Sequence, residues 1–142
     1  MRNSWSITNS IKDVIGGKDM TIKKNGELAP DRFNNSAGSI LFNHGYATVP
    51  NDVYFNPTTG GFTVMSWMKW FEFSGAQRLF EFGNEWPFDQ VFVAVGNKGR
   101  FYFVVYDNDI RYASGSTIEL VLNQWFHIAV TIGSNTMKFY MN

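Results

Sequence analysis

Two turns of the sequence hold the residues whose chemistry best suits ligand binding. The first turn places Trp86 among acidic and amide neighbours, and the second is a run of Asp and Asn flanked by Tyr and Arg. A sugar ring stacks on an aromatic face, while carboxylate and amide groups bond its hydroxyls. If the two turns meet at one end of the fold, they form a carbohydrate site made of Asn84, Glu85, Trp86, Tyr106, Asp107, Asn108, Asp109 and Arg111.

The first turn also has a purely structural interpretation. Trp86 and Phe88 are large apolar side chains, and they can close the end of a β-sandwich instead of meeting a ligand. For Phe88 we prefer this packing interpretation. For Trp86 both interpretations stay open.

The sequence lacks an arrangement of residues suited to hydrolysis. The nearest approach to a carboxylate pair is Glu81 with Glu85. In an extended strand these two would lie about 13 Å apart, whereas a retaining glycosidase needs about 5 to 5.5 Å. Gly83 stands between them, where a middle acid would be. His44 and His127 are each isolated, and His127 is interpreted as a packed or hydrogen-bonded structural residue. We therefore predict no catalytic residues and no enzymatic activity.

Oxygen ligands for a metal gather at one place, the run Asp107-Asn108-Asp109. This run departs from an EF-hand loop, because Arg111 stands where an acceptor should be. Asp and Asn also favour turns for local reasons, since they hydrogen-bond their own backbone, and the same reason explains Asp13. We predict no cofactor and no metal site, with calcium at Asp13, or at Asp107 and Asp109, as the alternative.

The composition describes a neutral chain that can bury one core. The 142 residues are 44% hydrophobic and 18% aromatic, which predicts a single domain over residues 1–142. Lys and Arg match Asp and Glu at 12 each, so the sequence carries no charge footprint for nucleic acid. Cysteine is absent, which excludes disulfides and thiol catalysis. No run approaches the roughly 20 apolar residues of a membrane span, and we expect no membrane insertion.

Alternation of apolar and polar residues is the main pattern of the chain. Short strands separated by turn signals about every ten residues are typical of all-β sandwiches and barrels. The closing segment predicts a β-hairpin, with Trp125–Thr131 as its first arm and residues 137–142 as its second. Its inward face would carry Phe126, Ile128, Val130 and Ile132. The other strand candidates are residues 20–22, 62–71, 77–82, 90–95, 100–106 and 110–113.

Two further segments give local predictions. Residues 62–71 are apolar on both faces, which predicts a strand covered on both sides within a sandwich. Residues 40–42 and 46–49 flank His44-Gly45, which predicts a tight hairpin with Gly45 at positive φ. No window combines helical spacing with capping residues. The predicted fold class is an all-β, antiparallel jelly-roll β-sandwich of two packed sheets with little or no helix.

Several short motifs occur in a characteristic order: Asp13 with Gly16, Asp31-Arg32-Phe33, Ser39-Ile40-Leu41-Phe42-Asn43, Gly61-Phe62-Thr63-Val64 with Trp67, Gly99-Arg100-Phe101, Trp125 with His127, Ala129-Val130-Thr131 and Lys138-Phe139-Tyr140-Met141-Asn142. In this order they resemble the laminin-G-like domains of the concanavalin A-like lectin/glucanase superfamily, along nearly the whole chain. The resemblance implies a non-catalytic binding module that recognises carbohydrate or protein through loops at one edge, with calcium bound in some members. It also implies further strands after Asn142, so we expect a domain that lacks its last strand or strands and belongs to a longer multidomain chain.

The sequence thus predicts a non-catalytic recognition module for carbohydrate or a glycosylated protein. The resemblance implies an extracellular or cell-surface location, and Asn34-Asn35-Ser36 is an N-glycosylation sequence of use only in a secreted protein. Two alternatives from other classes remain. One is a glucanase-like glycoside hydrolase domain that lacks the usual carboxylate cluster, and the other is a purely structural spacer.

Overall fold

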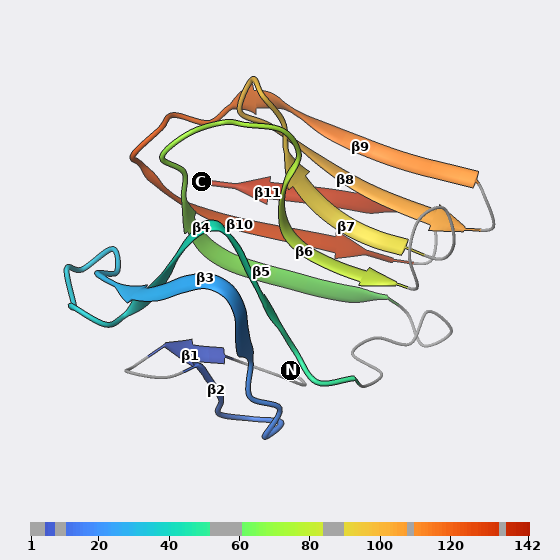
Figure 1. The fold of residues 1–142 in the computed structure, drawn as a ribbon. Helices are drawn as coiled ribbons and strands as arrows, with labels where there is room; N and C mark the ends of the chain where they lie inside the picture. Colours follow the sequence, from blue (N-terminus) through green and yellow to red (C-terminus); the bar gives the residue numbers. More distant parts are fainter. Residues whose placement is uncertain (1–4, 8–10, 52–60, 84–89, 108–109, 134–135) are drawn as a thin grey trace. The chain divides into compact units, whose positions relative to one another are not determined.

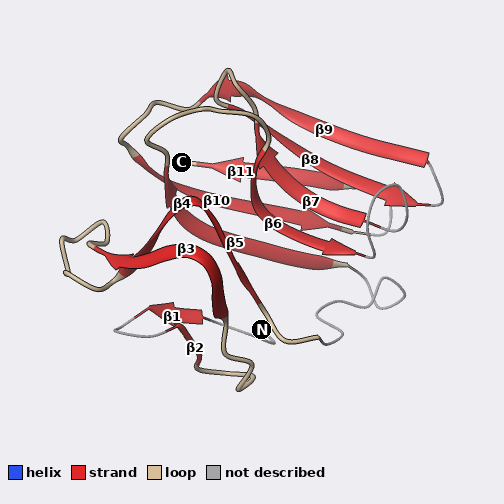
Figure 2. Ribbon diagram, in the orientation of Figure 1, coloured by secondary structure: helices blue, strands red, loops and turns tan. Residues whose placement is uncertain are grey.

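β-Strands and loops make up the fold of the computed structural model (Figures 1 and 2). The structure describes residues 5–7, 11–51, 61–83, 90–107, 110–133 and 136–142. Within these ranges there is no helix, and every strand pair is antiparallel, which confirms the predicted fold class. The strands are β1 (Trp5–Ile7), β2 (Ile11–Asp13), β3 (Thr21–Ala29), β4 (Ser39–Thr48), β5 (Phe62–Lys69), β6 (Gln77–Gly83), β7 (Gln90–Val95), β8 (Arg100–Asp107), β9 (Ile110–Glu119), β10 (Trp125–Ile132) and β11 (Met137–Met141).

None of the described residues belongs to a helix long and apolar enough to cross a membrane.

The chain divides into two compact units, residues 1–54 and residues 55–142. The first unit contains two strand pairs, β1 with β2 and β3 with β4. The second contains a three-stranded sheet in the order β11-β10-β5 and a four-stranded sheet in the order β6-β7-β8-β9. The single domain over residues 1–142, and the lack of its last strands, stay predictions.

One hydrophobic core joins the two sheets of the second unit. Phe101 of β8 is 1% exposed. Its ring lies between two other aromatic rings, that of Trp70 in the segment after β5 and that of Phe139 in β11. Its ring centroid is 5.3 Å from that of Trp70, edge-on, and 4.9 Å from that of Phe139. Val93 of β7 and Ile128 of β10 are buried in the same cluster. Two sheets with their inner faces packed together form a β-sandwich.

The closing hairpin has the predicted arrangement. β10 pairs with β11 from Ile128↔Met141 to Ile132↔Met137, and with β5 along its whole length. The alternation in its sequence is reproduced in its burial, because Phe126, Ile128 and Val130 are all buried in the core. The inward face predicted for this strand is therefore confirmed.

The prediction that both faces of the β5 segment are covered is wrong for the described residues. Phe62, Val64 and Met68 pack against the core. On the opposite face, Met65 and Phe71 are each 54% exposed, and Trp67 is 38% exposed. Periodicity shows which side chains share a face, but it cannot show how many faces have a covering layer.

The predicted hairpin across His44-Gly45 is also wrong. Both of its arms belong to the single strand β4, which pairs with β3 through an irregular stretch. His44 in β4 has a φ of 52°, and Asn25 in β3 has a φ of 41°. A Cβ on Gly45 would lie 2.1 Å from the carbonyl oxygen of Lys24. Gly45 is thus required by the close approach of β3, as at a β-bulge, and not by a turn.

Asp13 holds the turn after β2 together. Its side chain is buried at 5% exposure. Its carboxylate accepts hydrogen bonds from the backbone N–H groups of Ile15, Gly16 and Lys18, at 3.1, 3.0 and 3.2 Å. These bonds support the turn interpretation of Asp13, while calcium binding there stays a prediction. The described residues contain no group of three His, Asp or Glu side chains able to hold a metal ion.

Asp31 organises the loop between β3 and β4 and gives a first testable prediction. The hydrogen bond from the Asn35 side chain, followed by that from the Asn35 backbone N–H, lowers the pKa of the Asp31 carboxyl below 3.8. Because the folded pKa is lowered, the contribution of this carboxylate to stability is present above pH 3.8 and is lost as the pH falls through the folded pKa.

In a carboxyl-carbon NMR titration, Asp31 should therefore show a midpoint below 3.8. The variant Asn35→Ala removes the largest cause and should move the midpoint upward, toward the ordinary value. A wild-type midpoint at or above 3.8 would contradict the loop geometry.

Candidate functional site

The two turns predicted to bind a ligand leave the same end of the four-stranded sheet. The β6–β7 connection begins after Gly83 and ends before Gln90, and these two residues pair with each other. Gln90 in turn pairs with Tyr106, and Tyr106 pairs with Arg111 across the β8–β9 connection. These four residues therefore form one line across the sheet, called here the Gln90 row, at the right of Figure 1. The carbohydrate site predicted from the sequence required the two turns to lie at the same end of the fold, and the strand pairing brings their ends there.

Only part of the predicted site lies within the described residues. Tyr106 is half-buried, and Arg111 is exposed. Asp107 ends β8, although its side chain lies outside the described part. Both interpretations of Trp86, and the packing interpretation of Phe88, stay predictions. The predicted residues outside the described ranges are Asn84, Glu85, Trp86, Asn108 and Asp109.

Gln90, Tyr106 and Arg111 lie on the outer face of the four-stranded sheet. Their neighbours Val91 and Val105 point into or pack against the core. Successive side chains of a strand point to opposite faces. The residues of the Gln90 row therefore face away from the core.

Gln90 is unusual in this row, because its polar side chain is buried although it lies on the outer face. Its side chain is only 3% exposed, and its Nε2 donates a hydrogen bond to the Glu81 carboxylate. Its Oε1 is buried and accepts no hydrogen bond from any residue that the structure describes. Leaving a buried acceptor unsatisfied costs about 1–3 kcal/mol. Gln90 therefore keeps a buried acceptor that the described residues leave unsatisfied.

Charged and aromatic side chains of β6 and β7 surround the Gln90 amide. Glu81 forms an ion pair with Arg78, whose side chain is 44% exposed. The guanidinium carbon of Arg78 lies 4.8 Å from the ring centroid of Phe92. A cation, an anion, an amide and an aromatic ring therefore lie side by side, on Arg78, Glu81, Gln90 and Phe92. These groups suit a sugar, because its hydroxyls form hydrogen bonds and its ring face stacks on an aromatic ring.

Sequence reasoning missed Arg78, Glu81, Gln90 and Phe92 as members of a site. They lie inside strands, where alternation was used to find the core. They could have been found by asking which residues of these strands lie on the face opposite to the core. In β7 the apolar inner positions Val91, Val93 and Val95 leave Gln90 and Phe92 on the outer side.

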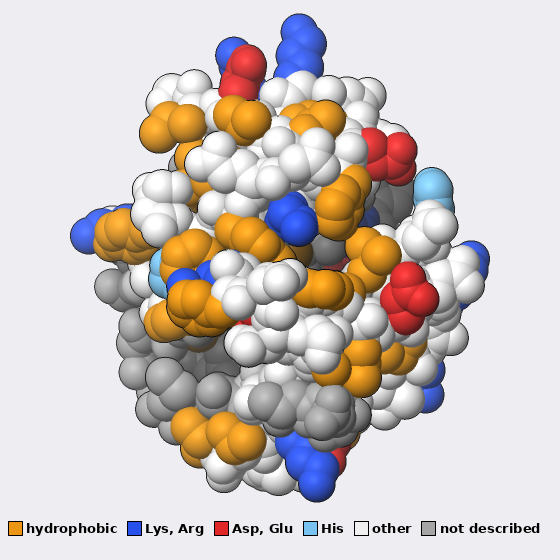
Figure 3. Space-filling view, turned by 90° about the vertical axis from the view of Figure 1, so that its left-hand side faces the viewer, with side chains coloured by type: hydrophobic (Ala, Val, Ile, Leu, Met, Phe, Trp, Pro, Cys, Tyr) orange, Lys and Arg blue, Asp and Glu red, His pale blue; other side chains and the backbone are white. Residues whose placement is uncertain are grey.

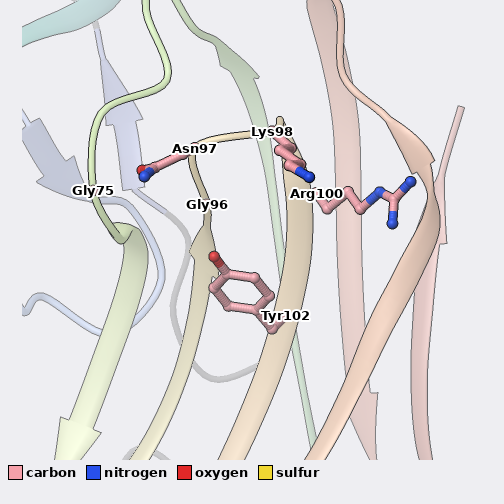
Figure 4. A pocket seen from close by; sticks show the side chains of 6 residues that line it. All are labelled: Gly75, Gly96, Asn97, Lys98, Arg100 and Tyr102. Carbon is pink, nitrogen blue, oxygen red and sulfur yellow. The ribbon is translucent and has the colours of Figure 1, made fainter.

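A separate hollow lies at the opposite end of the four-stranded sheet (Figure 4). It has a volume of about 410 Å³. Tyr102 contributes its ring, and a Cβ on Gly96 would lie 1.7 Å from the Tyr102 hydroxyl. The glycine therefore makes room for the hydroxyl. We call this the Lys98 hollow, and its lining residues are Gly75, Gly96, Asn97, Lys98, Arg100 and Tyr102.

Charge is dispersed over the surface that Figure 3 shows. Lys and Arg side chains lie beside Asp or Glu side chains at the top and at the bottom of this view, and the other charged side chains are scattered among hydrophobic and polar atoms. On this face no cluster of a single sign is visible, in keeping with equal numbers of 12 cationic and 12 anionic residues in the chain.

Comparison with known proteins gave one finding. Residues 41–142 match the laminin G model of the concanavalin A-like lectin/glucanases superfamily. This range includes β5 to β11, and hence the Gln90 row and the Lys98 hollow. No curated protein and no solved structure matches the chain.

Proposed function

Since the chain belongs to the concanavalin A-like lectin/glucanases superfamily, we propose that it is a non-catalytic module that binds carbohydrate, or the glycan of a glycoprotein, at the outer face of its four-stranded sheet. The observation that carries this proposal is the buried, unsatisfied Oε1 of Gln90. A sugar hydroxyl that displaces the atoms covering this oxygen and donates to it would remove the cost of leaving it unpaired.

The neighbours of Gln90 support the same proposal. Glu81 and Arg78 can accept from and donate to further hydroxyls, and their side chains are 35% and 44% exposed. Tyr106 and Arg111 stand in the same row on β8 and β9. The adjoining Trp86 turn would add a stacking surface. The extracellular or cell-surface location belongs to this proposal too, and in that location the exposed Asn34 would be accessible for glycosylation.

A glycan array probed with the intact chain tests the proposal. We expect binding to at least one class of glycan. The variant Gln90→Leu should weaken that binding by roughly tenfold, the scale of one hydrogen bond to a desolvated group. It should change thermal stability little, because it removes an unsatisfied buried acceptor together with the hydrogen bond from Nε2 to Glu81. Trp86→Ala tests the turn in the same assay.

The matched control is Tyr140→Ala. Tyr140 is an aromatic residue, 51% exposed, on the three-stranded sheet, so its loss should leave glycan binding intact. A silent array with folded wild-type protein would overturn the proposal in favour of a structural spacer. Release of reducing sugar from a β-glucan by the wild-type chain would contradict its non-catalytic part.

A further inference from the structure

The outer face of the three-stranded sheet carries large apolar side chains along β5. The outward positions of this strand are every second residue, because Phe62, Val64 and Met68 pack against the core. Among the outward side chains, Met65 is 54% exposed and Trp67 is 38% exposed. Apolar side chains that lie together on an exposed face are typical of surfaces that contact another molecule.

β5 is also an edge strand. Within the described residues β10 is the only strand that pairs with it, so no strand covers its other side (Figure 1). Natural sheets usually protect an exposed edge with a short strand, a proline, a bulge or several charges. β5 is eight residues long, contains no proline and pairs with β10 without a register shift, and Lys69 is its only charged residue. It therefore presents a long and regular edge.

The register shows which backbone groups point to this open edge. His127 bonds to Asn142 on the β11 side, because its N–H donates to the Asn142 side chain at 2.7 Å and its carbonyl oxygen accepts from the Asn142 N–H at 3.4 Å. The neighbours of His127 in β10 therefore direct their backbone groups toward β5, where one of them pairs with Ser66. Met65 and Lys69 occupy the alternate positions of β5, so their N–H and C=O groups point to the open edge.

Lys69 gives the open edge its charge. Its ammonium nitrogen lies 4.9 Å from the ring centroid of Phe71 and 5.1 Å from that of Trp125. These two rings hold the ammonium by cation–π contacts, and within the described residues it forms no ion pair. β5 contains no Asp or Glu, so the β5 edge of a second copy would offer Lys69 no counter-charge. A strand that carries a carboxylate would supply one.

We propose that the open edge of β5 binds an extended acidic segment of another protein, which adds to the three-stranded sheet as a further antiparallel strand. Main-chain hydrogen bonds to Met65 and Lys69 provide affinity, and alternate side chains of the segment provide specificity. Its Asp or Glu lies opposite Lys69, and apolar side chains at its next two alternate positions lie opposite Trp67 and Met65. A peptide backbone presents donors and acceptors in the row that this edge requires, and a lipid surface does not.

Backbone NMR of the intact chain, titrated with the peptide Ser-Glu-Thr-Ile-Thr-Val-Thr-Ser, tests the proposal. Amide signals of residues 63–69 should shift, and hydrogen exchange at Met65 and Lys69 should slow because their N–H groups become bonded. A peptide with Lys in place of Glu should bind about five- to tenfold more weakly, since like charges directly opposite each other are destabilising. A scrambled peptide of the same composition is the control for non-specific contact.

Two variants of β5 separate the roles of charge and backbone. Lys69→Glu should reverse the preference, so that the Lys peptide binds more tightly than the Glu peptide. Met65→Pro should weaken binding about tenfold, because it leaves a carbonyl of the peptide without its donor. Proline is tolerated on an edge strand where the N–H faces away from the sheet. Met65→Ala keeps this N–H and should weaken binding by a smaller factor. Lys138→Glu reverses an exposed charge on β11, the other edge of the same sheet, and is the matched control.

Equal binding of the scrambled peptide would overturn the proposal, and so would an absence of shifts at residues 63–69 at about 1 mM peptide, a concentration that half-saturates a weak site. A charge preference that Lys69→Glu fails to reverse would also overturn it, and this result can be read even if Met65→Pro does not fold. Slow exchange at Met65 and Lys69 without peptide, together with a concentration-dependent dimer, would overturn it in favour of a second copy. Glycan binding is tested separately, by the array and Gln90→Leu.

Discussion

Replacing Phe101 with alanine should lower the free energy of unfolding by about 3–5 kcal/mol, the usual cost of removing a buried aromatic side chain. Phe101 is 1% exposed and packs between Trp70 of one connection and Phe139 of the opposite sheet. Its removal leaves a cavity at the centre of the sandwich, where both sheets lose contacts. A domain is stable by only about 5–15 kcal/mol, so the variant should unfold at a much lower temperature.

Urea and thermal unfolding, followed by circular dichroism, measure this loss. Tyr140→Ala serves as the control, because Tyr140 is 51% exposed and lies on the outer side of the three-stranded sheet. Its change should stay within about 0.5 kcal/mol. A loss below about 1 kcal/mol for Phe101→Ala would show that this ring does not fill the core.

The second large effect is expected for Gly61→Ala, at the start of β5. Gly61 has a φ of 104°, and a Cβ there would lie 1.8 Å from the carbonyl oxygen of Ile132. The backbone conformation alone costs about 1–3 kcal/mol for a residue with a side chain. Relief of the clash also requires backbone movement, because the atom it meets is main-chain. The Phe62↔Ile132 end of the β5–β10 pairing should therefore open.

Gly75→Ala is the matched control for this prediction. Gly75 also has a positive φ, of 67°, but a Cβ there would meet nothing within 4 Å. It should cost only the left-handed backbone conformation, about 1–2 kcal/mol. Hydrogen exchange at the amides of Phe62 and Ile132 should accelerate in Gly61→Ala and not in Gly75→Ala. Equal destabilisation by the two variants would show that the close approach to Ile132 carries no cost.

The sequence predicted those parts of the fold that depend on local alternation. The apolar positions of β10 appear at every second residue, so both its face and its hairpin with β11 could be recognised. The outcome was different at β4, where His44-Gly45 has the composition of a turn. What decides its structure is the carbonyl of Lys24, a residue of the opposite strand β3, and no local pattern contains that information.

The candidate site, too, could be predicted only where local sequence patterns determine the structure. Turn composition located the two connections, and cross-strand register then brought their ends together at Gly83, Gln90, Tyr106 and Arg111. Gln90 itself could not be singled out, because an unsatisfied acceptor is a property of its surroundings and not of its residue type. Only the packed structure shows that Glu81 occupies the donor side of this amide while its oxygen remains unpaired.

The Gln90 row has a consequence for how such a module can diversify. The two connections that end at this row, β6–β7 and β8–β9, join neighbouring strands whose inner side chains, such as Val93 and Phe103, already fill the core. Lengthening a surface loop costs only about 0.6 kcal/mol for each doubling of its length. Insertions or exchanged loops after Gly83 and Tyr106 can therefore alter ligand preference while the sandwich stays folded. The same position makes this end of the sheet the natural place to graft a new specificity.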